Sequence, residues 1–116
     1  MTGVNRDDRA QRIADNEARF RELNDRLGRE LHGLVAAGET VEFVCECGSL
    51  ECREPLRLHL SEYERVRARS RTFAVVPGHE IPDIEDVVER REGYAVVEKP
   101  LSVAAQVEAA DPRTDG

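Results

Sequence analysis

The stretch VEFVCECGSLECREPLRLHL, residues 41–60, carries the clearest structural pattern in the sequence. Apolar and thiol side chains occupy every second position of its first half, at Val41, Phe43, Cys45 and Cys47. In a β-strand, every second side chain lies on the same face. Alternation resumes from Cys52 to Leu60, and Pro55 indicates an edge strand or a late start to the pairing. The stretch therefore predicts a β-hairpin with cysteines at its tip.

The cysteine spacing, Cys45-x-Cys47-x4-Cys52, indicates a metal site. Three cysteines in a chain whose charged first residues lack a secretory signal argue against a disulfide framework. Thiolates bind Zn²⁺ at about 2.3 Å, and closed structural sites have four tetrahedral ligands. Gly48 lets the backbone turn, so that Cys52 returns to the point that the first two cysteines face. The spacing therefore predicts three thiolate ligands to one Zn²⁺.

The fourth ligand has three histidine candidates. His79 follows Pro77-Gly78, a turn that can present a side chain to a fixed point. His59 has the strand parity opposite to that of Cys52, and His32 lies in a helical stretch with no turn beside it. We therefore predict a Cys3His zinc site that ties the first hairpin to the third strand, made of Cys45, Cys47, Cys52 and His79. Three acids nearby could complete the site instead, although we expect them to be solvated: Glu46, Glu51 and Glu80.

Other interpretations of the cysteines stay open. They could be three free thiols or a redox-sensing pair, although the C-x-x-C redox motif is absent. An iron–sulfur cluster normally needs four cysteines. Three cysteines plus a water would resemble the zinc of nucleobase deaminases, but the H-x-E…P-C-x-x-C signature is absent. Because a closed four-ligand site leaves no position for a catalytic water, we expect the protein not to be an enzyme.

The N-terminal part of the sequence predicts a long amphipathic helix from Arg9 to Ala37, ended by Gly38. Its apolar residues recur at helical spacing, at Ile13, Phe20, Leu23, Leu27, Leu31, Leu34 and Val35. Such a helix is about 40 Å long, whereas a domain of this size has a radius of gyration of about 13 Å. Either its first turns fray and the rest packs on a sheet, or the overhanging stripe binds a second copy of the chain or another protein.

The rest of the chain completes an α+β fold. Ser61 and Glu64 form a capping-box pattern at the start of a short helix over 62–69. A strand over 72–76 follows, and a second hairpin over 87–98 turns at Gly93. The predicted fold therefore has a long N-terminal amphipathic helix, two β-hairpins and a short helix, stapled by a metal site. The boundaries that we predict are a disordered N-terminus over 1–10, a single domain over 11–99 and a flexible tail over 100–116.

Composition limits the partners and the compartment. The 116 residues include 17 Lys and Arg against 24 Asp and Glu, a net charge of −7, which disfavours broad binding to nucleic acid. No apolar run approaches the roughly 18 residues of a membrane span, and the N-terminus has no apolar core of a secretory signal. We therefore expect a cytoplasmic protein without a membrane partner.

Arginine recurs at alternate positions in one basic stretch, at Arg65, Arg67, Arg69 and Arg71. Four arginines together could bind phosphates, so nucleic acid stays a less favoured partner. Pairing with acids such as Glu62 and Glu64, or with the acidic run at 83–86, explains the arginines better.

Several segments resemble a family of small, mostly uncharacterised actinobacterial proteins with a CxCxxxxC…PGHE pattern. They are NEARFRELN at 16–24, FVCECG at 43–48 with Cys52, LSEYERVRA at 60–68, FAVVPGHE at 73–80 and VVERREGYAVVEK at 87–99. The resemblance implies an intracellular protein and carries over no catalytic residue.

The function that these observations favour is a small, non-enzymatic zinc-binding protein that acts as a protein-interaction or regulatory module. Its partner would be another protein or a second copy, bound through the N-terminal helix. The alternatives are a nucleic-acid-associated regulator that uses the 65–71 arginines, and a thiol or zinc redox sensor.

Overall fold

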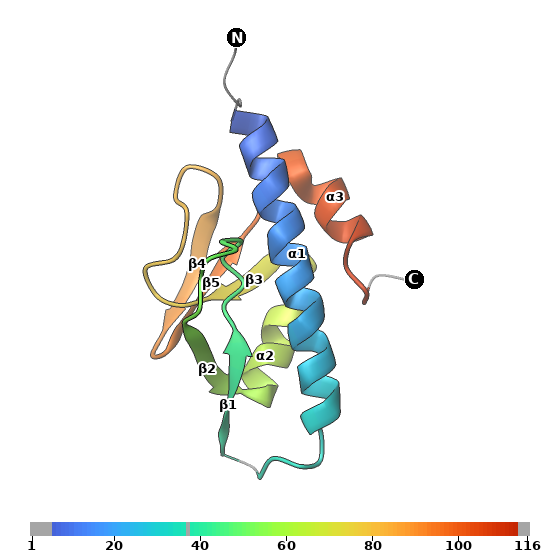
Figure 1. The fold of residues 1–116 in the computed structure, drawn as a ribbon, viewed down its shortest axis with the longest axis vertical. Coiled ribbons are helices and arrows are strands. Elements are labelled where there is room, and N and C mark those ends of the chain that lie inside the picture. Colours follow the sequence, from blue (N-terminus) through green and yellow to red (C-terminus); the bar gives the residue numbers. More distant parts are fainter. Residues whose placement is uncertain (1–5, 37, 114–116) are drawn as a thin grey trace.

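The computed structural model describes residues 6–36 and 38–113 and shows an α+β fold, as predicted. Helix α1 (Arg6–Leu31) runs along the long axis of the molecule, with the sheets to one side and α3 to the other (Figure 1). The remaining elements are β1 (Thr40–Val44), β2 (Pro55–His59), α2 (Leu60–Arg67), β3 (Thr72–Val75), β4 (Asp86–Arg91), β5 (Tyr94–Glu98), the 3-10 helix η1 (Leu101–Val103) and α3 (Ala104–Ala109).

Both predicted hairpins are confirmed. Strands β1 and β2 pair antiparallel in a two-stranded sheet, with Val44 opposite Pro55, so β2 is an edge strand that begins at its proline. The residues between the strands, 45–54, form the cysteine loop. Strands β4 and β5 pair antiparallel across a turn at Glu92-Gly93, where Gly93 has a φ of +91°. Strand β3 pairs with the other edge of β5, which gives the sheet order β3-β5-β4.

The apolar stripe that we predicted is only partly buried, and α1 buries polar positions beside it. Half-buried stripe residues still pack against the core, at Ile13, Leu27, Leu31 and Val35. Two stripe residues, Leu23 and Leu34, are 47% and 78% exposed. The buried positions are Ala14, Glu17, Arg21, Asn24 and Asp25. These residues also recur at helical spacing, but four of them are polar or charged, so a search for apolar periodicity assigns them to the solvent side. The helix also ends at Leu31, before Gly33 with its φ of +84°, and not at Gly38.

The predicted C-terminal tail is wrong in its first part. Residues after Lys99 form η1 and α3, and their Val103 and Val107 are buried in the core. The Gln106 side chain donates hydrogen bonds to the Gln11 carbonyl at 3.1 Å and to Asp15 Oδ1 at 2.7 Å, which attach α3 to α1. The end of that tail, 114–116, lies outside the described residues. Of the predicted disordered N-terminus, 1–5 lie outside them too, whereas α1 begins at Arg6.

The start of α2 lies two residues earlier than the capping-box pattern predicts. The Glu62 carboxylate accepts the His59 backbone N–H at 2.9 Å, so His59 is the N-cap. The predicted acid, Glu64, instead pairs with Arg113 at 2.7 Å. Tyr63 and Val66 are buried as expected.

Candidate metal centre

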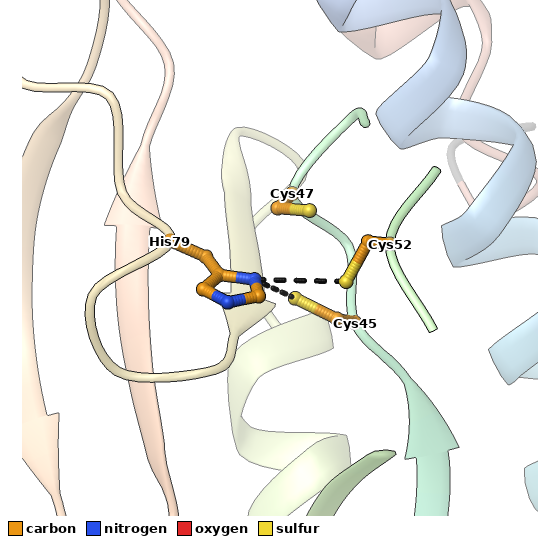
Figure 2. Close-up of side chains that lie close together, drawn as sticks. All are labelled: Cys45, Cys47, Cys52 and His79. Carbon is orange, nitrogen blue, oxygen red and sulfur yellow. Dashed lines mark hydrogen bonds between the residues drawn. The ribbon is translucent and has the colours of Figure 1, made fainter. Parts of the chain in front are cut away.

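Four side chains predicted to bind a metal lie together: Cys45, Cys47, Cys52 and His79. Their ligand atoms are all within 4.8 Å of one another. The cysteine loop supplies the three thiols, and the turn after β3 supplies the imidazole, which points into the group of sulfurs (Figure 2). The cluster therefore lies between the β1–β2 loop of the two-stranded sheet and the segment that follows β3 of the three-stranded sheet.

A glycine holds the cysteine loop against α1. Gly48 has a φ of +80°, in the left-handed region that favours glycine. A Cβ atom there would lie 2.7 Å from the Ile13 side chain and 3.1 Å from the Ile13 carbonyl. The Gly48 carbonyl accepts a hydrogen bond from Asn16 at 3.0 Å. Gly48 thus provides the turn that we predicted and also the close approach to the helix.

The distances suit a tetrahedral zinc ion. His79 Nδ1 lies 3.5 Å from Cys45 Sγ and 3.6 Å from Cys52 Sγ (Figure 2). With Zn–S bonds of about 2.3 Å and Zn–N bonds of about 2.0–2.1 Å, a tetrahedron has S···N edges of about 3.5–3.6 Å. A thiol–imidazole hydrogen bond has a similar length. The feature that indicates a metal is the proximity of all four ligand atoms, which lie within 4.8 Å of one another.

Each sulfur also accepts a backbone N–H. The Val76 amide donates to Cys45 Sγ at 3.2 Å. The Ser49 amide donates to Cys47, and the Glu54 amide donates to Cys52. Hydrogen bonds to a charged acceptor stabilise the charged form, so these amides favour thiolates over thiols.

The three thiols alter one another's pKa values. The hydrogen bond from Cys45, assisted by the Ser49 amide and His79, lowers the pKa of Cys47 to about 5. The hydrogen bond to Cys47 and burial raise the pKa of Cys45, and burial raises the pKa of Cys52. One thiolate is thus stabilised at the expense of its neighbours. Three thiolates together require a cation among them.

The other candidate ligands lie elsewhere. His59 Nδ1 is 3.0 Å from the Glu39 carbonyl, and His32 is exposed. We expected Glu46 to be solvated, but it is fully buried and accepts hydrogen bonds from Asn24, Tyr63 and the Ala74 amide. Glu80 is half-buried; it accepts the Gly78 amide and pairs with Arg90 at 3.3 Å. Glu51 is exposed.

The arginines of the basic stretch pair with acids and a backbone carbonyl, as we expected. Their partners, however, are not Glu62, Glu64 or the acidic run at 83–86. Arg67 is buried and pairs with Asp25 at 2.8 Å and with Asp111 at 2.5 Å. Arg65 pairs with Glu89 at 3.1 Å. Arg69 pairs with Glu98, and Arg71 donates to the Lys99 carbonyl at 2.7 Å. Arg67 therefore has no surface to offer to a phosphate.

Two buried clusters of charged side chains were not predicted from the sequence. The buried arginine cluster consists of Arg21, Asp25, Arg67 and Asp111. The buried lysine cluster consists of Lys99, Glu17 and Glu85. The Lys99 Nζ atom lies 2.9 Å from Glu17 Oε1 and 3.1 Å from Glu85 Oε2. Burial raises the pKa of Glu17 well above its usual range, against the attraction of Lys99. The residues of each cluster are far apart in the sequence, so no local motif indicates them.

Comparisons with protein families, with curated proteins and with solved structures return no match to this chain. The resemblance to actinobacterial proteins therefore stays a prediction. Among the described residues, no helix has both the length and the apolar character of a membrane span.

Proposed function

We propose that the protein is a small, non-enzymatic zinc-binding protein whose Cys3His centre is structural. The observation that carries this proposal is the convergence of four soft or borderline donors from two separate connections of the fold. Thiolates and imidazole are the ligands that zinc prefers in structural sites. Four protein donors complete its tetrahedron and leave no position for a reacting water.

The place of the centre in the fold supports a structural role. Cys45 and Cys47 are buried and belong to the same apolar core as Phe73, Val75 and Val97. Between the cysteine loop and His79, the chain passes through β2, α2 and β3. A metal bound by both segments would link the two-stranded sheet directly to the three-stranded one.

The molecular role that we propose is binding of another protein, or self-association, in the cytoplasm. Two exposed apolar side chains, Leu23 on α1 and Leu34 in the segment that follows it, are available to such a partner and support this role. The arginine pairing described above weighs against the nucleic-acid alternative, because Arg67 is buried and its neighbours are engaged.

Metal titration of the purified full chain tests the proposal. We expect one zinc per chain, displaced only slowly by a chromophoric chelator. His79→Ala should weaken zinc binding, whereas the matched control His59→Ala, which changes a histidine outside the cluster, should leave it unchanged. A chain that binds no zinc, or that loses zinc equally with both substitutions, would contradict the proposal. Light scattering of wild type and Leu23→Ser would separately test self-association through α1.

A further inference from the structure

The two ring nitrogens of His79 face different partners. Nδ1 lies on the side of the sulfurs, 3.5 Å from Cys45 Sγ and 3.6 Å from Cys52 Sγ. Nε2, on the other side of the ring, lies 3.3 Å from Glu54 Oε2. A neutral imidazole carries its proton on one nitrogen only, so a partner at Nε2 determines whether the Nδ1 lone pair is free.

Glu54 contacts both parts of the cluster. It stands two residues after Cys52, and its backbone amide donates to the sulfur of that cysteine. Its carboxylate faces the histidine that arrives from the turn after β3. The next residue, Pro55, begins β2 and pairs with Val44, so the backbone at Glu54 is anchored to the sheet. Proline also restricts the conformation of the residue before it.

We propose that Glu54 is a positioning residue of the metal centre: its carboxylate accepts the Nε2–H of His79 and so directs the Nδ1 lone pair at the metal. This inference rests on the proposed zinc site. Metal-bound histidines commonly donate their second ring N–H to a carboxylate, which fixes the tautomer and increases the basicity of the ligand.

The surroundings leave the Glu54 carboxylate available for this role. The neighbouring cation, Arg53, donates instead to the carbonyls of Leu50 and Cys52, at 2.9 and 3.0 Å. The side chain of Glu54 is 62% exposed and that of His79 is 27% exposed. Water therefore competes with the contact, which places the expected effect at the lower end of the 10- to 100-fold range for such partners.

The experiment measures zinc affinity in the full chain by competition with a chromophoric chelator. Glu54→Ala removes the carboxylate but keeps the backbone amide that binds Cys52, and it should weaken zinc binding about tenfold. Glu54→Gln should be intermediate, because its amide oxygen can accept the Nε2–H without the negative charge. The matched control is Glu51→Ala, which removes the same charge from an exposed residue of the same loop and should leave the affinity unchanged.

Two further readouts separate positioning from a general effect on the loop. In the His79→Ala background, Glu54→Ala should cause no additional loss, since the residue through which it acts is gone. In the zinc-bound wild type, nitrogen-15 spectra of His79 should show a protonated Nε2 whose hydrogen exchanges faster in Glu54→Ala. Equal affinities of Glu54→Ala and Glu51→Ala, or the same tenfold loss without His79, would overturn the inference. Absence of zinc from the wild type would instead contradict the proposed function.

Discussion

The metal centre and the buried arginine cluster both join distant segments, but they differ in how their parts are encoded. Three of the four metal donors lie within eight residues of one another, in the cysteine loop. Arg67, by contrast, is 42 residues from Asp25 and 44 from Asp111. The spacing of the cysteines in the sequence indicates the metal centre. The arginine cluster has no such pattern, because its residues come together only when the chain folds. Dense local spacing is therefore a far better guide to a site than charge alone.

The two regions also differ in what they contribute to stability. A structural zinc site supplies folding free energy directly, because the unfolded chain has no preformed site. A buried ion pair recovers little more than the desolvation cost of its charges, although removing one partner is expensive. Burial alone would lower the pKa of Arg67, but the hydrogen bonds to Asp25 and Asp111 outweigh it and raise that pKa. We expect the metal to dominate stability and the arginine cluster to define how α1, α2 and α3 dock.

Metal removal should have the largest effect. Structural zinc contributes roughly 10–16 kcal/mol of apparent binding free energy in small sites, as much as the whole stability of a typical domain, about 5–15 kcal/mol. We expect the chelated protein to be partly unfolded and to regain its melting transition when zinc is added back. Thermal unfolding followed by circular dichroism measures this, and a chelator saturated with zinc is the control. An unchanged melting temperature after chelation would show that the centre is not a staple.

Arg67→Met should be the next most damaging change. It leaves Asp25 and Asp111 buried without their main cation, which costs about 3–5 kcal/mol when a buried pair is broken. The matched control is Arg69→Met, because Arg69 also pairs with an acidic residue, Glu98, but its side chain is 61% exposed. That pair should be worth about 0–1 kcal/mol. Urea unfolding of zinc-loaded protein gives both values, and similar losses for the two variants would remove the distinction.

Glu46→Gln and Glu17→Gln should separate a buried carboxylate that accepts three hydrogen bonds from neutral donors from one that lies beside Lys99 and Glu85. Glu46 accepts hydrogen bonds from Asn24, Tyr63 and Ala74, so an amide placed there faces donors and should cost about 1–3 kcal/mol. Glu17 pairs with Lys99, which keeps Glu85 in the variant, and the Glu17 side chain also interacts with Glu85. Glu17→Gln should therefore be close to neutral. A larger loss of unfolding free energy for Glu17→Gln than for Glu46→Gln would contradict this ranking.

The smallest effect should be a dependence of stability on pH that comes from Glu17. Burial raises its pKa in the folded state, despite Lys99, and the neighbouring Glu85 raises it further. The unfolded chain releases this proton at a lower pH than the folded chain does. The contribution is therefore fully present below the ordinary carboxyl pKa and is lost as pH rises through the folded-state pKa. Unfolding free energies across that range should fall less steeply in Glu17→Gln than in wild type.

The sequence predicted the hairpins and the metal cluster because each depends on short-range pattern. The alternation at Val41 and Phe43 and the turn at Gly93 are local signals, and both are confirmed. The predicted alternation does not continue to Cys47, because β1 ends at Val44 and Glu46 is buried beside the cysteines. His79 was identified because only its turn could present a side chain freely. Glu54 was missed, although its position two residues after Cys52 was a usable signal.

The two largest errors, the buried face of α1 and the C-terminal helix, have the same physical cause, which is tertiary contact that overrides local preference. Glu17, Arg21, Asn24 and Asp25 are polar, yet partners from distant segments let α1 bury them. The C-terminal helix has a weak pattern and is held by two valines and by Gln106. A search that equates burial with apolar residues cannot find such contacts.

X-ray absorption at the zinc edge of the purified full chain would identify the ligands of the proposed Cys3His centre. A closed Cys3His centre predicts three sulfur neighbours at about 2.3 Å and one nitrogen neighbour at about 2.0–2.1 Å. In His79→Ala the nitrogen should disappear while the three sulfurs remain. A zinc ion bound through oxygen, or with fewer than three sulfurs, would contradict the proposed centre.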